Sequence, residues 1–231
     1  PVFPHESDFS PGLANRIISR RSTAVFTSFP ETASMLKNGI YSGPPVRREL
    51  YRGSREAGLK KYRFDGKKPV LLSFGGGSGS AALCAALEGA LPRLLARFDV
   101  INIAGKNAKV PAKEGYVPLE FEQNMADAYA CADYVISRAG SNTVFELLAL
   151  KKPALLVPLE NKRSRGDQAE NAAYFSEQGL CRVLHEKELS PDTLLSELEK
   201  LVQDESLKSA LARRRMRDGN DAILAALLAA R

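Results

Sequence analysis

The chain has few of the residues from which disulfide frameworks and metal centres are built. Among its 231 residues are three cysteines, Cys84, Cys131 and Cys181, and two histidines, His5 and His185. The cysteines lie far apart in apolar segments, which argues against a disulfide framework and fits a reducing compartment. The two histidines and the lack of any Asp-x-Asp pair argue against a zinc site and against a divalent ion on a diphosphate. We therefore expect no cofactor and no metal site; a divalent cation is the alternative, which the sequence does not indicate.

Long apolar runs and a secretion signal are also missing. No run of eighteen or more apolar residues occurs, and residues 1–5 have neither a charged region nor an apolar one. We therefore expect neither a membrane span nor a signal peptide. The chain does not begin with Met, and Val2-Phe3 resembles the end of a strand, so we expect a piece of a longer protein.

Tryptophan is absent and aromatic residues make up only 7% of the chain, so stacking platforms for bases are scarce. The formal net charge of +6 comes from basic clusters that are dispersed rather than gathered in one stripe. Nucleic-acid binding is therefore not expected. A weak preference for anionic membrane surfaces or phosphorylated ligands stands beside a merely solvated basic surface. The basic clusters are Arg20-Arg21, Arg47-Arg48, Lys60-Lys61, Lys151-Lys152 and Arg213-Arg214-Arg215.

What the chain does contain is a regular alternation of apolar runs and helical patterns. The apolar runs are continuous rather than alternating, which predicts a parallel sheet covered on both faces. The predicted fold is therefore α/β, a doubly wound and Rossmann-like parallel sheet. The charged segment 52–68 receives no element. Predicted strands cover residues 23–28, 69–74, 99–104, 116–121, 134–136, 153–157 and 180–184, and predicted helices cover 10–21, 31–37, 83–98, 125–131, 147–150 and 167–178, with two or three more at the end.

In doubly wound sheets, ligands bind beyond the carboxyl ends of the strands. Four loops of this sequence follow predicted strands and are expected to meet at that rim. They are Gly75–Gly79, Phe121-Glu122, Arg138–Thr143 and Pro158–Asp167.

The stretch Arg138–Glu146 reads as a strand end, a turn of small residues and the start of a helix. Such a turn directs free backbone N–H groups and the positive end of the helix dipole at an anion, for which a phosphate is the natural candidate. Glu146 could then reach a neutral hydroxyl beside the anion, which suggests a ribose diol. The alternative is that Thr143-Val144-Phe145-Glu146 forms a capping box, in which Glu146 only satisfies backbone donors.

The glycine-rich loop Gly75–Gly79 matches neither the dinucleotide fingerprint nor a P-loop, because the spacing of the first and the Gly-Lys-Ser/Thr ending of the second are missing. Its backbone could still approach a diphosphate closely, with Ser78 adding a hydroxyl. A tight turn without any ligand is the alternative.

A second capping-box candidate is Asp167-Gln168-Ala169-Glu170. Gln168 and Asn171 are three residues apart and therefore lie on one face near the start of the same helix. Two neutral amides on one face suit the hydroxyl groups of a sugar, although surface amides without a ligand are common.

Four segments, in this order, resemble the MurG family, the peptidoglycan N-acetylglucosaminyltransferases of glycosyltransferase family 28. The resemblance implies the C-terminal half of a GT-B fold. It also implies transfer of GlcNAc, with inversion, from UDP-GlcNAc to lipid I, giving lipid II in peptidoglycan synthesis. The partners it implies are UDP-GlcNAc, lipid I and the cytoplasmic face of the membrane, where the protein would be peripheral and would bind mostly through the domain that is missing here. The segments are His5–Asn15, Gly43–Arg47, Arg138–Glu146 and Arg165–Asn171.

The resemblance also implies roles for single residues. Arg47 and the backbone at Glu122 would hold the uracil, Glu146 the ribose, and Gln168 with Asn171 the GlcNAc. Ser141, Asn142 and Thr143 would cradle the diphosphate, and the donor-binding set is completed by Gly76, Gly77, Ser78, Phe121 and Gly140. The serine of the glycine loop stands one place later than in the family's Gly-Gly-Ser-x-Gly. His5 and Glu6 match the family's His-Glu pair and are candidates for acceptor handling or catalysis, with the main base expected outside this chain.

The same resemblance divides the chain. Residues 1–43 are expected to be a remnant of the N-terminal acceptor domain, residues 44–217 the UDP-GlcNAc-binding domain, and residues 218–231 a helix that packs back on the first domain with its apolar side otherwise exposed. We expect this chain alone to be inactive. Another UDP-sugar enzyme of the same scaffold, such as an epimerase or a glycolipid synthase, and a non-catalytic binding half are the alternatives.

Overall fold

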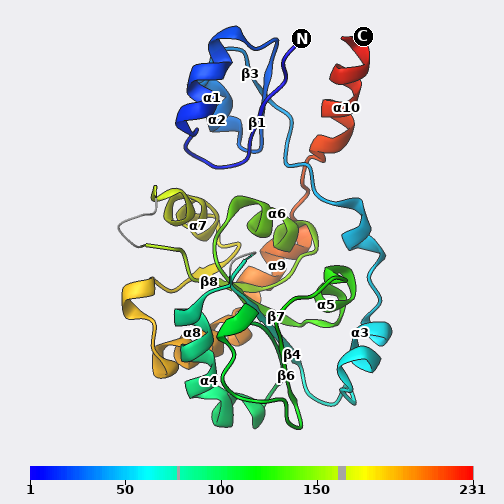
Figure 1. The fold of residues 1–231 in the computed structure, drawn as a ribbon, viewed down its shortest axis with the longest axis vertical. Coiled ribbons are helices and arrows are strands. Elements are labelled where there is room, and N and C mark those ends of the chain that lie inside the picture. Colours follow the sequence, from blue (N-terminus) through cyan, green and yellow to red (C-terminus); the bar gives the residue numbers. More distant parts are fainter. Residues whose placement is uncertain (77–78, 161–164, 231) are drawn as a thin grey trace.

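A computed structural model describes residues 1–76, 79–160 and 165–230. It contains two parallel sheets, one of three strands in the order β1-β2-β3 and one of six strands in the order β6-β5-β4-β7-β8-β9. The larger sheet reverses direction of growth at β4, as expected of a doubly wound fold (Figure 1). The predicted α/β class and parallel sheet are confirmed.

The six-stranded sheet is built from the continuous apolar runs. Of its two central strands, β4 is buried throughout and β7 is buried except at its first residue, because helices cover both faces. Phe74, the last residue of β4, lies opposite Ile103, the last residue of β5, so the carboxyl ends of these strands form one edge. The strands are β4 (Val70–Phe74), β5 (Asp99–Ile103), β6 (Tyr116–Leu119), β7 (Tyr134–Ser137), β8 (Ala154–Leu156) and β9 (Arg182–Val183).

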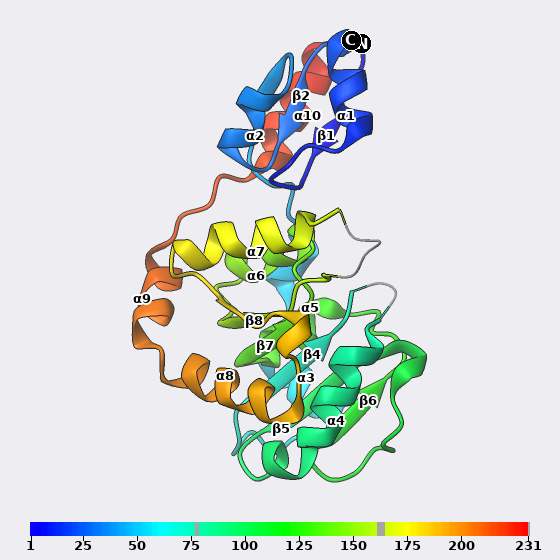
Figure 2. The same cartoon turned by 90° about the vertical axis from the view of Figure 1, so that its left-hand side faces the viewer.

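Helices cover both faces of this sheet. In Figures 1 and 2, α4 and α8 lie on one side of it and α3 and α5 on the other. The helix α3 lies in the charged segment 52–68, for which no element was predicted. The helices of this part are α3 (Arg55–Tyr62), α4 (Ala81–Leu95), α5 (Met125–Cys131), α6 (Ser141–Ala149), α7 (Asp167–Glu177), α8 (Pro191–Gln203) and α9 (Glu205–Arg213).

The first 41 residues form a small unit around the three-stranded sheet. The predicted helix 10–21 begins later, at Leu13, because Gly12 donates its N–H to the Glu6 carboxylate at 2.8 Å instead of entering the helix; it ends at Arg21 as predicted, with a 3₁₀ turn over Ser19–Arg21. A cluster of aromatic rings joins this unit to α6 and α7: Phe29 lies 5.0 Å from Phe145 and 5.5 Å from Phe175, between ring centroids. The unit consists of β1 (His5–Glu6), α1 (Leu13–Ile18), β2 (Val25–Thr27), α2 (Pro30–Met35) and β3 (Gly39–Tyr41).

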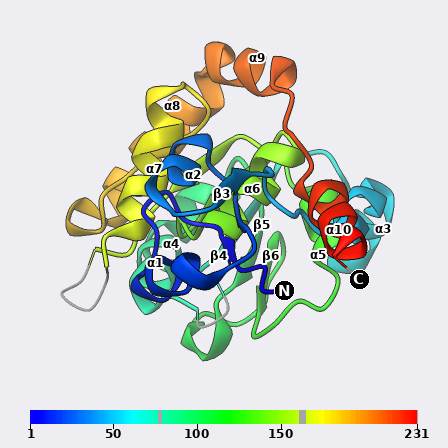
Figure 3. The same ribbon diagram turned by 90° about the horizontal axis from the view of Figure 1, so that it is seen from above.

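The last helix, α10 (Gly219–Ala229), lies at the same end of the molecule as the N-terminal unit (Figures 1 and 3). Gly219 donates its N–H to Pro44 at 3.0 Å, which ties the start of the helix to the linker after β3. Leu224, Leu227 and Leu228 are exposed, as the sequence analysis expected of its apolar side. Within the described ranges, none of the helices has the length and apolar character needed to cross a bilayer.

Candidate functional site

A cavity of about 300 Å³ opens at the rim of the larger sheet, beyond the carboxyl ends of β4 and β5. Three of the four loops predicted to meet at the rim contribute to its lining. Six predicted donor-binding residues line it: Arg47, Gly76, Phe121, Glu122, Thr143 and Glu146.

Glu146 lies at the back of this cavity and is 9% exposed. Its Oε1 accepts a hydrogen bond from Arg47 Nε at 2.9 Å, and its Oε2 accepts one from the Tyr129 hydroxyl at 3.1 Å. The capping-box alternative is wrong, because α6 begins at Ser141 and Glu146 stands in its second turn, where no backbone donors are free. Each carboxylate oxygen accepts only one of these bonds and keeps capacity for a hydroxyl donor from the cavity.

Tyr129 was not among the predicted site residues. Burial, and then the neighbouring Glu146 carboxylate, raise the pKa of Tyr129 well above its ordinary value, so the phenol is protonated and donates. Its hydroxyl fixes one carboxylate oxygen while Arg47 fixes the other. The helix α5 shows an unremarkable apolar pattern in sequence, and no motif distinguishes this aromatic residue from a core residue.

The loop after β6 brings Phe121 and Glu122 to the cavity mouth. The Glu122 side chain turns inward, where its carboxylate accepts bonds from Lys61, from the Tyr62 hydroxyl at 2.7 Å and from Asn124 N at 2.7 Å. Burial alone would raise the pKa of Glu122, but the bonds from Lys61 and Tyr62 lower it. The carboxylate is therefore charged, and it is already engaged by protein donors rather than directed at the cavity. No described residue hydrogen bonds to the peptide N–H or C=O of Glu122. Phe121 is 72% exposed and offers a free ring face.

The amino terminus of α6 lies beside Glu146. Its N-cap is Gly140, which has no side chain, and the first helical residues Ser141, Asn142 and Thr143 leave their N–H groups without intrahelical acceptors. Together with the helix dipole they attract an anion. Across the cavity, Gly76 has a φ of 77°, and no atom of the described residues lies within 4 Å of the position that a Cβ would take, so the described surroundings leave room for a ligand. Gly77 and Ser78 lie outside the described residues.

The two amides predicted to bind sugar lie on α7 but do not line the cavity. The capping box proposed for Asp167–Glu170 is wrong, because the helix begins at Asp167 and its N-cap is Gly166, which has no side chain. Gln168 Oε1 accepts the Leu159 N–H at 3.0 Å. Asn171 is fully buried, and both ends of its amide are engaged with the N-terminal unit.

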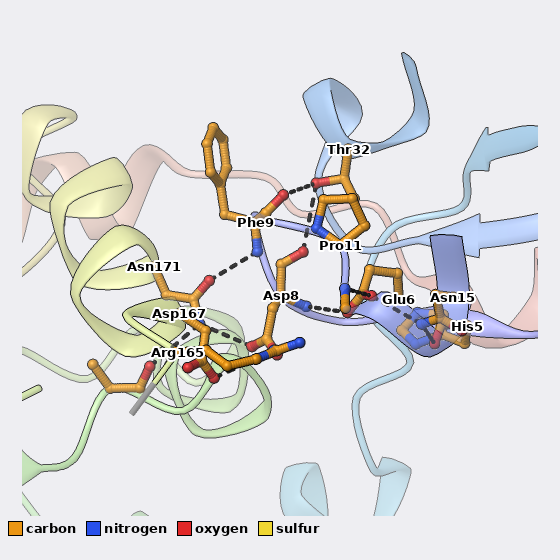
Figure 4. A network of polar contacts seen from close by, with 12 residues as sticks. His5, Glu6, Asp8, Phe9, Pro11, Asn15, Thr32, Arg165, Asp167 and Asn171 are labelled. Atoms are coloured by element: carbon orange, nitrogen blue, oxygen red, sulfur yellow. Dashed lines mark hydrogen bonds and ion pairs between the residues drawn. The ribbon is translucent and has the colours of Figure 1, made fainter. Parts of the chain in front are cut away.

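Figure 4 shows this contact between the N-terminal unit and α7. Asn171 Oδ1 accepts from Phe9 N at 2.9 Å, and its Nδ2 donates to Asp8 Oδ1 at 3.0 Å. The other oxygen of Asp8 pairs with Arg165 at 3.0 Å. The assignment of Asn171 to a sugar therefore stays a prediction, and it requires these bonds to be exchanged.

His5 and Glu6 are neighbours in β1, but their side chains have different surroundings. Glu6 is buried and its carboxylate accepts bonds from Asp8 N, Gly12 N and Asn15 Nδ2 at 2.8–3.1 Å, so it organises its own loop. The His5 Nε2 lies 3.3 Å from Ser28 Oγ, and its ring lines a second cavity of about 270 Å³ that it shares with Asn142, Arg47 and Glu146. Of the two, only His5 faces the neighbourhood of the candidate site.

The fold defines the class of protein: this is the C-terminal half of a GT-B glycosyltransferase. The chain belongs to glycosyltransferase family 28, since the model of the glycosyltransferase family 28 C-terminal domain matches residues 70–223. This match and the 45% and 42% identical relatives described next together confirm the resemblance to the MurG family drawn from the four motifs.

Relatives with similar sequences carry the same family assignment. The chain is 45% identical over 207 residues to the UDP-N-acetylglucosamine–N-acetylmuramyl-(pentapeptide) pyrophosphoryl-undecaprenol N-acetylglucosamine transferase of Clostridium kluyveri, and 42% identical over 210 residues to that of Geobacillus thermodenitrificans. These matches cover 87% and 88% of this chain and 59% of each relative, so the chain spans about three fifths of their length.

Among solved structures, MurG of Acinetobacter baumannii superposes with a TM-score of 0.67 at 25% identity, over 96% of this chain and 65% of that one. The calicheamicin glycosyltransferase CalG4 superposes with a TM-score of 0.64 at 19% identity, over 90% of this chain and 52% of that one, and shares the fold.

Proposed function

We propose that this chain is the donor-binding half of an inverting N-acetylglucosaminyltransferase that takes UDP-GlcNAc. The observation that carries the proposal is Glu146, a carboxylate fixed by Arg47 and Tyr129 beside the free amino terminus of α6, in one rim cavity. An anion-binding helix end next to a hydroxyl-accepting carboxylate matches a nucleoside diphosphate. The printed names of the relatives support GlcNAc as the sugar.

Within this proposal each part of the cavity receives one part of the donor. The base lies against the exposed ring of Phe121 and bonds to the peptide of Glu122, the ribose hydroxyls donate to Glu146, and the diphosphate lies between α6 and the glycine loop at Gly76. The acceptor is a lipid-linked muramoyl-pentapeptide, as in the relatives' names, and the product is lipid II. The general base of catalysis, which removes the proton from the acceptor hydroxyl, lies outside this chain.

Calorimetric titration tests the donor site. We expect the chain to bind UDP and UDP-GlcNAc, and Glu146→Gln to weaken both about tenfold, because a charge-assisted bond to the ribose becomes a neutral one. Glu49→Gln is the matched control, since Glu49 also lies near Arg47, at 4.0 Å, but does not line the rim cavity. If the native chain does not bind UDP, the proposal is refuted. If this chain alone turns over lipid I, the part of the proposal that restricts it to donor binding is refuted.

We also propose that the full-length protein works at the cytoplasmic face of the membrane, as a peripheral protein. The helix α1 supports this, because Leu13, Ile17 and Ile18 are exposed and the basic pair Arg20-Arg21 follows them after one residue, Ser19. Replacing Leu13 and Ile17 together by Glu should abolish sedimentation with vesicles that contain anionic phospholipid. The control is Met35→Glu, which changes an exposed apolar residue of α2; equal binding by both variants would contradict the proposal.

A further inference from the structure

Arg138 opens the stretch that forms the anion-binding turn, yet neither the motif nor the proposed function gives its side chain a role. It follows β7 directly, is 8% exposed, and does not line the rim cavity. A guanidinium does not lose its charge in a protein, so burying it requires the fold to supply acceptors for its N–H groups.

Those acceptors come from three separate segments. Arg138 Nη1 donates to the carbonyl groups of Val157 and Pro158, both at 3.2 Å, in the loop after β8. Arg138 Nη2 donates to Ser80 Oγ at 2.7 Å and pairs with Glu186. Ser80 is the N-cap of α4, the helix that follows the glycine loop, and its Oγ also accepts the Leu83 N–H. One side chain thus joins the end of the glycine loop to the loop after β8.

The loop after β8 is held at its far side by Glu186, the partner of Arg138. Glu186 Oε2 accepts the Glu160 N–H at 3.3 Å, and Glu160 in turn accepts the Glu186 N–H at 3.1 Å. Between these points, the Leu159 N–H donates to Gln168. The loop that Arg138 fixes therefore contacts the amide predicted for the sugar, while Ser80 adjoins the loop predicted for the diphosphate.

We infer that Arg138 is a positioning residue that sets the spacing between the diphosphate and sugar portions of the donor site. The inference rests on the proposed function, because it names what that site requires. Arg138 does not line the rim cavity; it acts through Ser80 on one loop and through Val157, Pro158 and Glu186 on the other. Lysine cannot replace it, since an ammonium lacks the planar fork that reaches acceptors on three segments at once.

The experiment compares Arg138→Lys with Arg55→Lys. Arg55 is a matched control because it also pairs with a carboxylate, Asp133, at 2.9 Å and donates to a backbone carbonyl, at Cys131, but at the amino end of β7. Calorimetry measures uridine, UDP and UDP-GlcNAc for each variant. We expect Arg138→Lys to lower UDP-GlcNAc affinity about tenfold or more while uridine stays within about twofold, and Arg55→Lys to leave all three within about twofold.

Amide hydrogen exchange provides a readout that needs no ligand. In Arg138→Lys the Leu83 and Glu160 amides should exchange faster, because their acceptors are Ser80 and Glu186. In Arg55→Lys the Val70 amide should respond instead, because its acceptor is Asp133 at 2.8 Å. Unchanged protection at both Leu83 and Glu160 in Arg138→Lys would overturn the inference.

The remaining outcomes also decide. Loss of uridine and UDP-GlcNAc affinity in equal proportion would make Arg138 a general stabiliser, and native binding of all three ligands would make it dispensable; either overturns the inference. If Arg138→Lys does not fold, Glu186→Gln tests the same link, with a loss of about threefold or more expected for UDP-GlcNAc and none for uridine. If the native chain binds none of the three, the proposed function fails, whereas hydrogen exchange still decides whether Arg138 holds the two loops.

Discussion

At the scale of single residues, the candidate site is organised before a ligand arrives. The Glu146 carboxylate has one oxygen on Arg47 and the other on Tyr129, so its orientation is fixed without a ribose. A ligand that meets a fixed acceptor does not have to order that side chain, which favours affinity. Arg47 is half-exposed on the cavity side and can still contact the base while it holds Glu146.

His5 offers a residue-level test through its titration. Burial lowers the pKa of His5 below its ordinary value of 6.5, more than the nearby Glu6 carboxylate raises it. The unfolded chain therefore binds more protons than the folded chain as pH falls below about 6.5, and the free energy of unfolding decreases in that range and is level above it. We expect native protein to lose stability to urea between pH 6.5 and pH 5, and His5→Gln to lose less.

The chain has only two histidines, so a His185→Gln background leaves the His5 ring as the sole imidazole signal in NMR. Its midpoint should lie below 6.5. A midpoint above 6.5 would mean that the ring is charged in the folded state, and the expected direction of the stability change would then be reversed.

At the scale of elements, all six strands of the larger sheet were predicted from the sequence, whereas the short strands β1 and β3 and the helix α3 were not. Runs such as Val70–Phe74 and Tyr134–Ser137 are buried on both faces, so almost every residue is apolar and the pattern is visible without any alignment. The helix α3 was missed because only Gly58 and Tyr62 are buried in it, and these two residues make no apolar stripe. The close packing of α3 against α5 depends on Gly58, which has no side chain, and a search for hydrophobic periodicity does not detect a glycine contact.

That fit predicts the effect of Gly58→Ala. A Cβ at Gly58 would lie 2.6 Å from the Asp127 carbonyl oxygen and 2.8 Å from the Cys131 Cβ, so α3 and α5 must move apart. Alanine favours a helix by about 1 kcal/mol, but the clash should outweigh this and lower the free energy of unfolding by about 1–2 kcal/mol net. Urea denaturation measures it, with Lys60→Ala on the exposed side of α3 as the control. Greater stability in Gly58→Ala would show that the two helices separate at little cost.

At the scale of the whole molecule, the sequence motifs located the candidate site, but they did not predict the contacts around it between segments that are distant in the chain. The motif with Arg138–Glu146 placed Thr143 and Glu146 at the cavity correctly, because strand order and helix starts follow from local pattern. The engagement of Asn171 with Asp8 and Phe9 joins residues more than 160 positions apart, and no local pattern records such a pair. Tyr129 was not predicted for the same reason, since its partner Glu146 lies on another helix, α6.

This contact leads to a prediction about how the two units cooperate. Asn171 is fully buried while Asp8 and Phe9 engage its amide, so a sugar must displace them to reach it, and the donor sugar and the N-terminal unit compete for one side chain. Asp8→Ala removes a competitor and should raise the affinity for UDP-GlcNAc about threefold or more, while UDP, which has no sugar, should bind as before. Calorimetry of both ligands gives the ratio directly.

Glu31→Gln is the matched control for this effect. Glu31 also joins the N-terminal unit to α7, where both of its oxygens lie 3.1 Å from the Tyr174 hydroxyl, but it does not contact Asn171. Weakening that bond should leave the ratio of UDP-GlcNAc to UDP affinity unchanged. If Asp8→Ala instead lowers UDP-GlcNAc affinity, the bonds from Asp8 and Phe9 hold Asn171 ready for the sugar rather than compete with it, and the N-terminal unit is then a wall of the donor site.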